Sequence, residues 1–167
     1  SWRMLLECWL AGVLASWLFL AWGSRPIAAA TGGVLYVFAC VVGQILWPPA
    51  ASTLALFPAV LLCAEKLLVN SDSRGWWCGL AAVMALQLFA GFPQYVVYGF
   101  FIAVPVVVLR AFEAPAAWRR LLGIAAAVAT GFGLAAIQLV PTLELAGGSL
   151  RAAASTATDL HYLTIWD

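Results

Sequence analysis

Hydrophobic residues gather in six long stretches of the chain, and short segments rich in proline, glycine or charge separate them. Each stretch is a continuous apolar run without the alternation of a barrel strand, so the pattern predicts helices that cross a lipid bilayer. We therefore expect an all-α fold, a polytopic transmembrane helical bundle of about six membrane segments. The predicted segments are Met4–Trp22, Pro26–Leu46, Ala50–Leu62, Trp76–Ala90, Tyr95–Leu109 and Leu121–Val140.

The third segment is the weakest of the six. It holds 13 residues, whereas a helix that crosses a bilayer needs about 20, and Pro58 interrupts it. The pattern thus predicts a segment that is tilted, kinked or partly re-entrant. The distribution of charge nevertheless requires it to cross, because the sidedness of every later loop depends on it.

Lysine and arginine occur in every second loop between the segments, and the loops after the second and fourth segments have none. The first, third and fifth loops hold Arg25, then Lys66 and Arg74, then Arg110, Arg119 and Arg120. With Arg3 and Arg151 near the two ends, one face carries six cations and the other carries two. Cytoplasmic loops are enriched in lysine and arginine, so the six-cation face is predicted to be cytoplasmic.

Composition agrees with a membrane location. The chain is 65% hydrophobic and 9% charged, with a mean hydropathy of +1.02, whereas a soluble domain is about 25% charged. The net charge of +1 gives no indication of nucleic-acid binding. Because Glu65, Asp72 and Glu113 are interleaved with the basic residues, we interpret these charges as topology signals in solvated loops.

The first segment is interpreted as a true span. It contains Glu7, and no A-x-A cleavage pattern lies before the next segment, as a signal peptide would require. The chain begins at Ser1 without an initiator methionine. We therefore expect residues 1–167 to be part of a single transmembrane helical domain in a longer protein.

The cysteines and the histidine give no indication of a metal site. His161 has no companion at ligand spacing, so zinc is not expected. No cofactor is identified, and a requirement for a divalent cation is left open. No catalytic triad, P-loop or dinucleotide-binding glycine pattern is present. The cysteines lack a CxxC pair and are expected to pack as small apolar residues; they are Cys8, Cys40, Cys63 and Cys78.

Tryptophans and small residues mark the ends and the contacts of the predicted helices. An aromatic belt at the headgroup level explains the tryptophans at segment ends, and Trp47 also fits an alternative role as a platform for a sugar. Small residues four apart in the sixth segment predict close helix packing, with a groove for a lipid tail as the alternative. These small residues are Gly123, Ala127, Gly131 and Ala135.

Polar groups concentrate near three proline-marked junctions on the predicted external face. Gln87 and Gln138 each precede such a junction by one turn, where they are predicted to satisfy carbonyls that proline leaves free. Glu7 either snorkels to the interface or is a functional carboxylate. Glu144 follows a span directly, and Arg151 lies seven residues later. Structural pairing of these two residues and contact with a substrate both stay open.

The order of these motifs resembles that of the YfhO-type bacterial membrane proteins, which belong to the GT-C class of polytopic glycosyltransferases. In that family an Ala-Gly-His-Pro-Gln-like motif is followed by Gln-x-x-Pro-x-x-Glu and then Ser-x-Arg. The resemblance covers nearly the whole chain, including Trp47-Pro48-Pro49, Phe57-Pro58 and Glu65-Lys66, but Phe92 stands where the family has histidine. The matching motifs are Ala90-Gly91-Phe92-Pro93-Gln94, Gln138-Leu139-Val140-Pro141-Thr142-Leu143-Glu144 and Ser149-Leu150-Arg151.

The resemblance implies glycosyl transfer on the external face of the bacterial inner membrane. The expected partners are a polyprenyl-phosphate-linked sugar donor, membrane lipid, and an acceptor that is an envelope glycan, lipid or polymer. Gln94, Glu144 and Arg151 are the implied substrate-binding residues, with Glu144 at the acceptor or a bound cation and Arg151 at the donor phosphate. The family's catalytic acidic residue would precede Ser1, so no catalytic residue is assigned. The alternatives are a transporter or flippase of a lipid-linked or small polar substrate, and a non-catalytic scaffold subunit.

Overall fold

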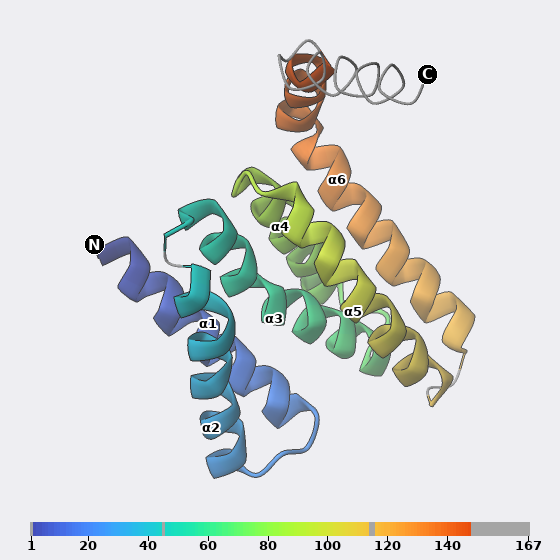
Figure 1. Ribbon diagram of the computed structural model, residues 1–167. Coiled ribbons are helices and arrows are strands. Elements are labelled where there is room, and N and C mark those ends of the chain that lie inside the picture. The colour runs from blue at the N-terminus through green and yellow to red at the C-terminus, as the bar shows by residue number, and fades with distance from the viewer. Residues whose placement is uncertain (1, 45, 114–115, 148–167) are drawn as a thin grey trace, which may run out of the picture. The chain divides into compact units, whose positions relative to one another are not determined.

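The computed structural model describes residues 2–44, 46–113 and 116–147, and this part of the chain is helical without strands (Figure 1). The predicted all-α bundle is confirmed. The chain divides into two compact units, Ser1–Ala135 and Ala136–Asp167. The elements are α1 (Trp2–Ala21), α2 (Pro26–Tyr36), the π-helical η1 (Val37–Val41), the 3-10 helix η2 (Val42–Gln44), α3 (Pro48–Val69), α4 (Arg74–Phe89), α5 (Pro93–Phe112) and α6 (Ala117–Gly147).

Five of the helical segments are long and apolar enough to cross a membrane, and α4 is shorter at 16 residues. The third segment is not the short one: α3 has 22 residues and continues through Pro58. The prediction stopped too early because Glu65 and Lys66 were assigned to a solvated loop. Both lie inside α3, where Arg110 of α5 pairs with the Glu65 carboxylate.

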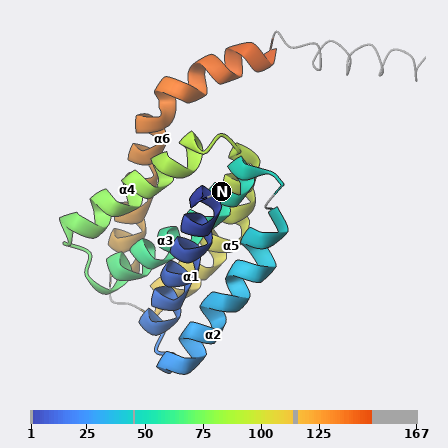
Figure 2. The same cartoon turned by 90° about the vertical axis from the view of Figure 1, so that its left-hand side faces the viewer.

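Helix α3 is the centre of the first unit. It contacts α1, α4 and α5, and the two views of the ribbon show it between them (Figures 1 and 2). In its apolar stretch 67% of the residues are buried, compared with 17% in α1 and in α5. The outer helices therefore turn most of their large hydrophobic side chains outward, as helices that face lipid do.

Polar side chains from neighbouring helices support α3 at its internal proline. Pro58 has no N–H, so the carbonyl of Leu54 loses its helical donor. The Tyr36 hydroxyl donates to that carbonyl at 2.7 Å. One residue earlier, the buried Gln87 amide donates to the carbonyl of Thr53 at 2.9 Å. Gln87 was predicted to bind a carbonyl that proline leaves free at the end of its own helix. It binds a backbone carbonyl of α3 instead, and Pro58 does not free that carbonyl, because the helical donor to Thr53 is the N–H of Phe57.

Small residues bring two pairs of helices close together. A Cβ added to Gly33 of α2 would lie 2.6 Å from the Gly12 carbonyl of α1. A Cβ added to Gly131 of α6 would lie 2.6 Å from the Met84 Cβ and 2.7 Å from the Ala81 carbonyl of α4. With Ala127 and Ala135 at 0% exposure, this confirms that the stripe of small residues is a packing surface. Gly123 has open space instead.

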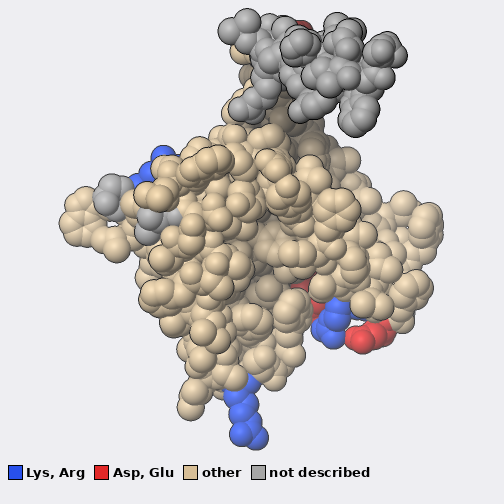
Figure 3. Space-filling model, viewed as in Figure 1, with Lys and Arg blue, Asp and Glu red and all other residues tan. Residues whose placement is uncertain are grey.

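The charged side chains of the first unit are few. The face in Figure 3 is almost entirely uncharged, and its blue and red side chains form small, separate groups. Trp2, Trp22, Trp47 and Trp118 lie at helix ends and are exposed by 84, 37, 60 and 71% respectively. A multi-pass membrane protein has this distribution of apolar faces and interfacial indoles.

The described part of the second unit is the last portion of α6, up to Gly147. Pro141 lies inside this helix. The Thr142 hydroxyl donates to the Gln138 carbonyl at 2.7 Å, while the Gln138 side chain is exposed. Next to Pro141, therefore, a threonine hydroxyl supplies the bond to a backbone carbonyl.

Candidate functional site

The polar chemistry of the first unit lies at its two ends. At one end, which we call the proline end, α1, α3 and α5 begin, and its residues include Arg3, Trp47 and Phe92. At the other end, which we call the clamp end, the same three helices finish, and Trp22, Glu65 and Arg110 meet there. The cation count predicts that the proline end is external and the clamp end cytoplasmic.

Four aromatic rings form a continuous cluster at the proline end. The ring centroids of Trp47 and Phe92 are 5.8 Å apart, those of Phe92 and Tyr95 are 5.1 Å apart, and those of Tyr95 and Tyr98 are 5.9 Å apart. Gln94 donates from Nε2 to the Tyr98 hydroxyl at 2.6 Å. Trp47 is 60% exposed and Tyr98 is 49% exposed. The cluster therefore presents ring faces beside an amide and a phenol.

The turn between α4 and α5 places Phe92 and Gln94 in this cluster. Gly91 has φ +85°, a left-handed conformation that glycine adopts without strain. Pro93 follows as the first residue of α5, where its missing N–H costs no hydrogen bond. Phe92 contacts Trp47 and Tyr95. The turn thus holds Phe92 within the aromatic cluster.

A second polar group at the proline end joins α1 to α3. Arg3 Nε donates to Glu7 Oε1 at 2.8 Å, and Arg3 Nη2 donates to the Ser52 hydroxyl at 2.9 Å. That hydroxyl has one proton, which it donates either to Glu7 Oε1 at 2.7 Å or to the Pro48 carbonyl at 2.9 Å. The Arg3 side chain is 62% exposed and that of Glu7 is 16% exposed. Glu7 is thus paired within the protein, and the guanidinium remains accessible.

The clamp end holds a buried carboxylate that was predicted to be solvated. Glu65 is 6% exposed. Its Oε1 accepts a bond from Arg110 Nη2 at 2.6 Å, and its Oε2 accepts bonds from Arg110 Nε and Trp22 Nε1, both at 3.3 Å. Arg110 also pairs with Glu113 at 3.0 Å. The prediction of solvated loop charges is wrong for Glu65, because its partners come from helices that are distant in sequence.

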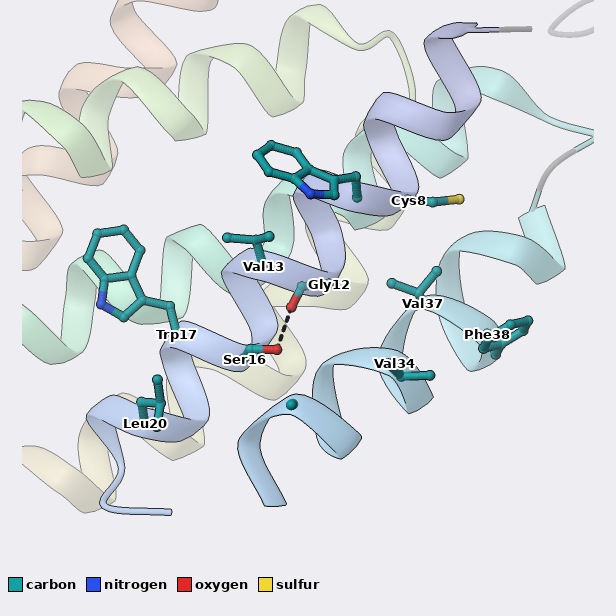
Figure 4. Close-up of a pocket in the computed structure, with 11 residues that line it drawn as sticks. Cys8, Gly12, Val13, Ser16, Trp17, Leu20, Val34, Val37 and Phe38 are labelled. Atoms are coloured by element: carbon teal, nitrogen blue, oxygen red, sulfur yellow. Dashed lines mark hydrogen bonds between the residues drawn. The ribbon is translucent and has the colours of Figure 1, made fainter. Parts of the chain in front are cut away.

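A groove of 610 Å³ between α1 and α2 offers little to a polar substrate. Figure 4 shows Val13, Trp17, Val34 and other apolar side chains around it. Its hydroxyl, from Ser16, already donates to the Gly12 carbonyl of the same helix at 2.8 Å. We therefore place the candidate site at the proline end and not in this groove.

The three substrate-binding residues predicted from the motifs have different outcomes. Gln94 is exposed at the proline end, in the aromatic cluster. Glu144 is exposed on the part of α6 that belongs to the second unit. Arg151 lies outside the described residues. The shared site of these three residues therefore stays a prediction.

Sequence reasoning identified Glu7 as a candidate carboxylate, but it missed the pairing of Glu7 with Arg3 and the two tyrosines of the aromatic cluster. Arg3 and Glu7 are four apart on one helix, and Tyr95 and Tyr98 are three apart, so each pair had a recognisable helical spacing. Ser52 gave no local signal, because its partners lie on α1. In the described part of the chain, no group of three or more histidine, cysteine, aspartate or glutamate residues could hold a metal ion.

Comparisons with protein-family models, with curated proteins and with solved structures find no match to this chain. The resemblance to the YfhO-type proteins therefore rests on the order of the sequence motifs. The geometry of the proline end adds contacts that the motifs do not encode, although Trp47, Phe92 and Gln94 themselves belong to those motifs.

Proposed function

We propose that this chain is part of a membrane glycosyltransferase that acts at the proline end, on the external face of the bacterial inner membrane. The donor is a polyprenyl-phosphate-linked sugar, and the acceptor is an envelope glycan, lipid or polymer. The acceptor hydroxyl attacks the anomeric carbon and the bond from that carbon to the phosphate oxygen breaks. The polyprenyl phosphate then leaves, and a carboxylate takes the hydroxyl proton.

The aromatic cluster beside Gln94 is the observation that carries the proposal. The apolar face of a sugar ring stacks on an exposed indole or phenol, and amide groups bond its hydroxyls. In this scheme Trp47 and Tyr98 supply the ring faces and Gln94 supplies the amide. These residues lie at helix ends, where a lipid-linked sugar reaches water while its tail stays in the bilayer.

Charged residues complete the scheme. The exposed Arg3 guanidinium lies at the same end of the first unit and suits the donor phosphate. By resemblance, Arg151 supplies a second phosphate contact and Glu144 contacts the acceptor or a bound cation. The catalytic carboxylate is assigned to the family's first large external loop, which would precede Ser1.

A transporter or flippase remains the alternative function. Such a protein commonly has ionisable groups and broken helices near the middle of the membrane. In the described residues Glu7, Glu65 and Arg110 all lie near helix ends, which favours chemistry at an interface. The test must therefore measure sugar transfer and lipid translocation separately.

The activity test compares two tryptophans of the proline end in the full-length protein. Trp47→Ala should lower kcat/KM for a lipid-linked sugar at least about tenfold, as truncation of a tryptophan that packs against a bound partner does. Trp2→Ala is the matched control, because Trp2 is also exposed and lies outside the aromatic cluster. Arg151→Lys keeps the charge but loses the bidentate fork, so it should weaken donor use more than folding. If Trp47→Ala and Arg151→Lys both transfer sugar at the parent rate, the site does not lie on this face.

Orientation is a premise of the proposal and has its own test. In intact cells, cysteines introduced at Ser73 and Ala116 should be protected from a membrane-impermeant thiol reagent, and one at the exposed Leu46 of the proline end should be labelled. The reagent must be applied in a background that lacks the exposed Cys78. Labelling at Ser73 with protection at Leu46 would place the aromatic cluster in the cytoplasm and contradict the proposal.

A further inference from the structure

An apolar groove of 460 Å³ runs between α3, α4, α5 and α6 within the first unit. This volume is within the range of about 300–1,000 Å³ for small-molecule sites. Every lining side chain is a hydrocarbon, as in Leu61, Leu80, Val104, Ile124 and Ala125. We propose that this groove holds one acyl chain of an anionic phospholipid, and that Arg119 and Arg120 contact the lipid phosphate.

The position of the groove places the acyl chain and the headgroup of the lipid in different environments. Its lining extends from Phe100 and Ala129, in the middle of their helices, to Val108 and Leu121, near the clamp end. Leu121 directly follows Arg120 in α6. An acyl chain lying along this lining therefore ends at the level of the two arginines along α6, where the headgroups lie.

The charges at this end select an anion. Arg110 is already paired with Glu65 and Glu113. In the described residues Arg119 and Arg120 form no ion pair. Two adjacent cations without a carboxylate partner complement a phosphate, and each basic residue near a lipid surface adds roughly fivefold to the binding of anionic lipid.

The start of α4 lies against the same part of α6. Trp77 Nε1 donates to the Gly123 carbonyl at 3.1 Å, so the first turns of α4 and α6 are fixed to each other. Arg74, the first residue of α4, adds a third cation at this end. The groove is thus lined by hydrocarbon side chains, and basic residues lie at the end of it that is near the headgroups. This assignment does not depend on glycosyl transfer.

The first test measures lipid retained by the intact protein. The protein purified from membranes in mild detergent should carry phosphatidylglycerol, detected by native mass spectrometry. Ala125→Phe places a ring in the groove and should remove most of that lipid. Ala126→Phe is the matched control, because Ala126 is exposed on the same helix but does not line the groove. Equal retention in the two variants would contradict the proposal.

The second test concerns the headgroup. After delipidation, binding of phosphatidylglycerol should be about 30-fold weaker in the Arg119→Gln, Arg120→Gln double variant. Binding of phosphatidylcholine should change little. Arg25→Gln is the control cation, since it lies in the loop between α1 and α2. An equal loss with Arg25→Gln, or equal binding of the two lipids by the parent protein, would overturn the headgroup contact.

A protein helix is the other occupant that would fit an apolar groove. If Ala125→Phe changes the oligomeric state while phospholipid retention stays at the parent level, the groove holds a helix and the lipid assignment is wrong. Analytical ultracentrifugation of the two phenylalanine variants separates these outcomes.

Discussion

Each end of the first unit has a carboxylate paired with a guanidinium, but the two pairs are built differently. At the proline end Arg3 and Glu7 belong to one helix, and the Arg3 side chain is 62% exposed. At the clamp end Glu65 and Arg110 come from α3 and α5, and the Glu65 side chain is 7% exposed. Trp22 adds α1 to the second pair. The clamp end thus joins three helices through one carboxylate.

The difference separates a structural role from a binding role. An exposed pair within one helix contributes little to stability, so its groups can exchange partners with a ligand. A buried carboxylate has no such freedom, because each missing partner leaves a charge in an apolar environment. We therefore interpret the clamp end as the fixed part of the unit and the proline end as the part that contacts substrate.

Removal of the two carboxylates is the most direct way to break this comparison. Glu65→Ala should lower the free energy of unfolding by about 2–3 kcal/mol. This is less than for a fully buried pair, because Arg110 is 40% exposed and keeps Glu113. Glu7→Ala should cost about 1 kcal/mol or less. Reversible unfolding in mixed micelles measures both.

Glu113→Gln is the control for this prediction. Glu113 also pairs with Arg110, but its side chain is 69% exposed, so the loss of stability should be small, about 0.5 kcal/mol. If Glu7→Ala destabilises as strongly as Glu65→Ala, the two ends do not differ and the proline end is also structural.

The two ends also differ in how far the sequence predicted them. Continuous apolar runs located all six helical segments, because hydrophobicity is a local property of the chain. The pairing of Glu65 with Arg110 joins residues 45 positions apart, so local patterns assigned both to solvated loops and ended the third segment too early. Pro58 was expected to interrupt the third segment, whereas α3 continues through it, and the Tyr36 hydroxyl that binds the freed Leu54 carbonyl comes from another helix.

The proline end was predicted in outline. Prolines and the tryptophan at position 47 marked the junctions, and Gln94 was identified there. Contacts between α1 and α3, such as Arg3 with Ser52, were missed because their residues are 49 apart. The prediction that Gln94, Glu144 and Arg151 share a site depends on residues in both units and is still to be tested.

Gly131 lies at neither end of the first unit. A packing defect at this glycine is therefore the reference for a variant that loses stability alone. Gly131→Ala should cost about 1–3 kcal/mol, because the new Cβ would meet the Ala81 carbonyl at 2.7 Å and backbone cannot move aside easily. Gly133→Ala on the same helix meets nothing within 4 Å, so it should be neutral or gain up to about 1 kcal/mol from helix propensity.

Thermal unfolding of the two glycine variants in detergent measures this difference. Transfer activity per folded molecule should stay at the parent level in both, whereas variants of the aromatic cluster should lose activity without losing stability. A normal unfolding temperature for Gly131→Ala would mean that α6 does not pack on α4 through this glycine.

The smallest expected effect comes from making the same substitution at both ends. It is also the most sensitive test of the comparison. Trp22 and Trp47 are both exposed indoles at helix ends, but only Trp22 has a described bond from Nε1, to the Glu65 carboxylate at 3.3 Å. Phenylalanine keeps a ring and removes that donor. Trp22→Phe should therefore cost about 1 kcal/mol, since the bond is long but reaches a charged acceptor. Trp47→Phe keeps an aromatic contact with Phe92, so stability should change by about 0.5 kcal/mol or less.

Sugar transfer by Trp47→Phe should stay well above that of Trp47→Ala, because the ring face and not the indole N–H is proposed to contact the sugar. Equal stability losses at the two positions would show that the N–H of Trp22 has no special role, and a Trp47→Phe variant as inactive as Trp47→Ala would argue against stacking.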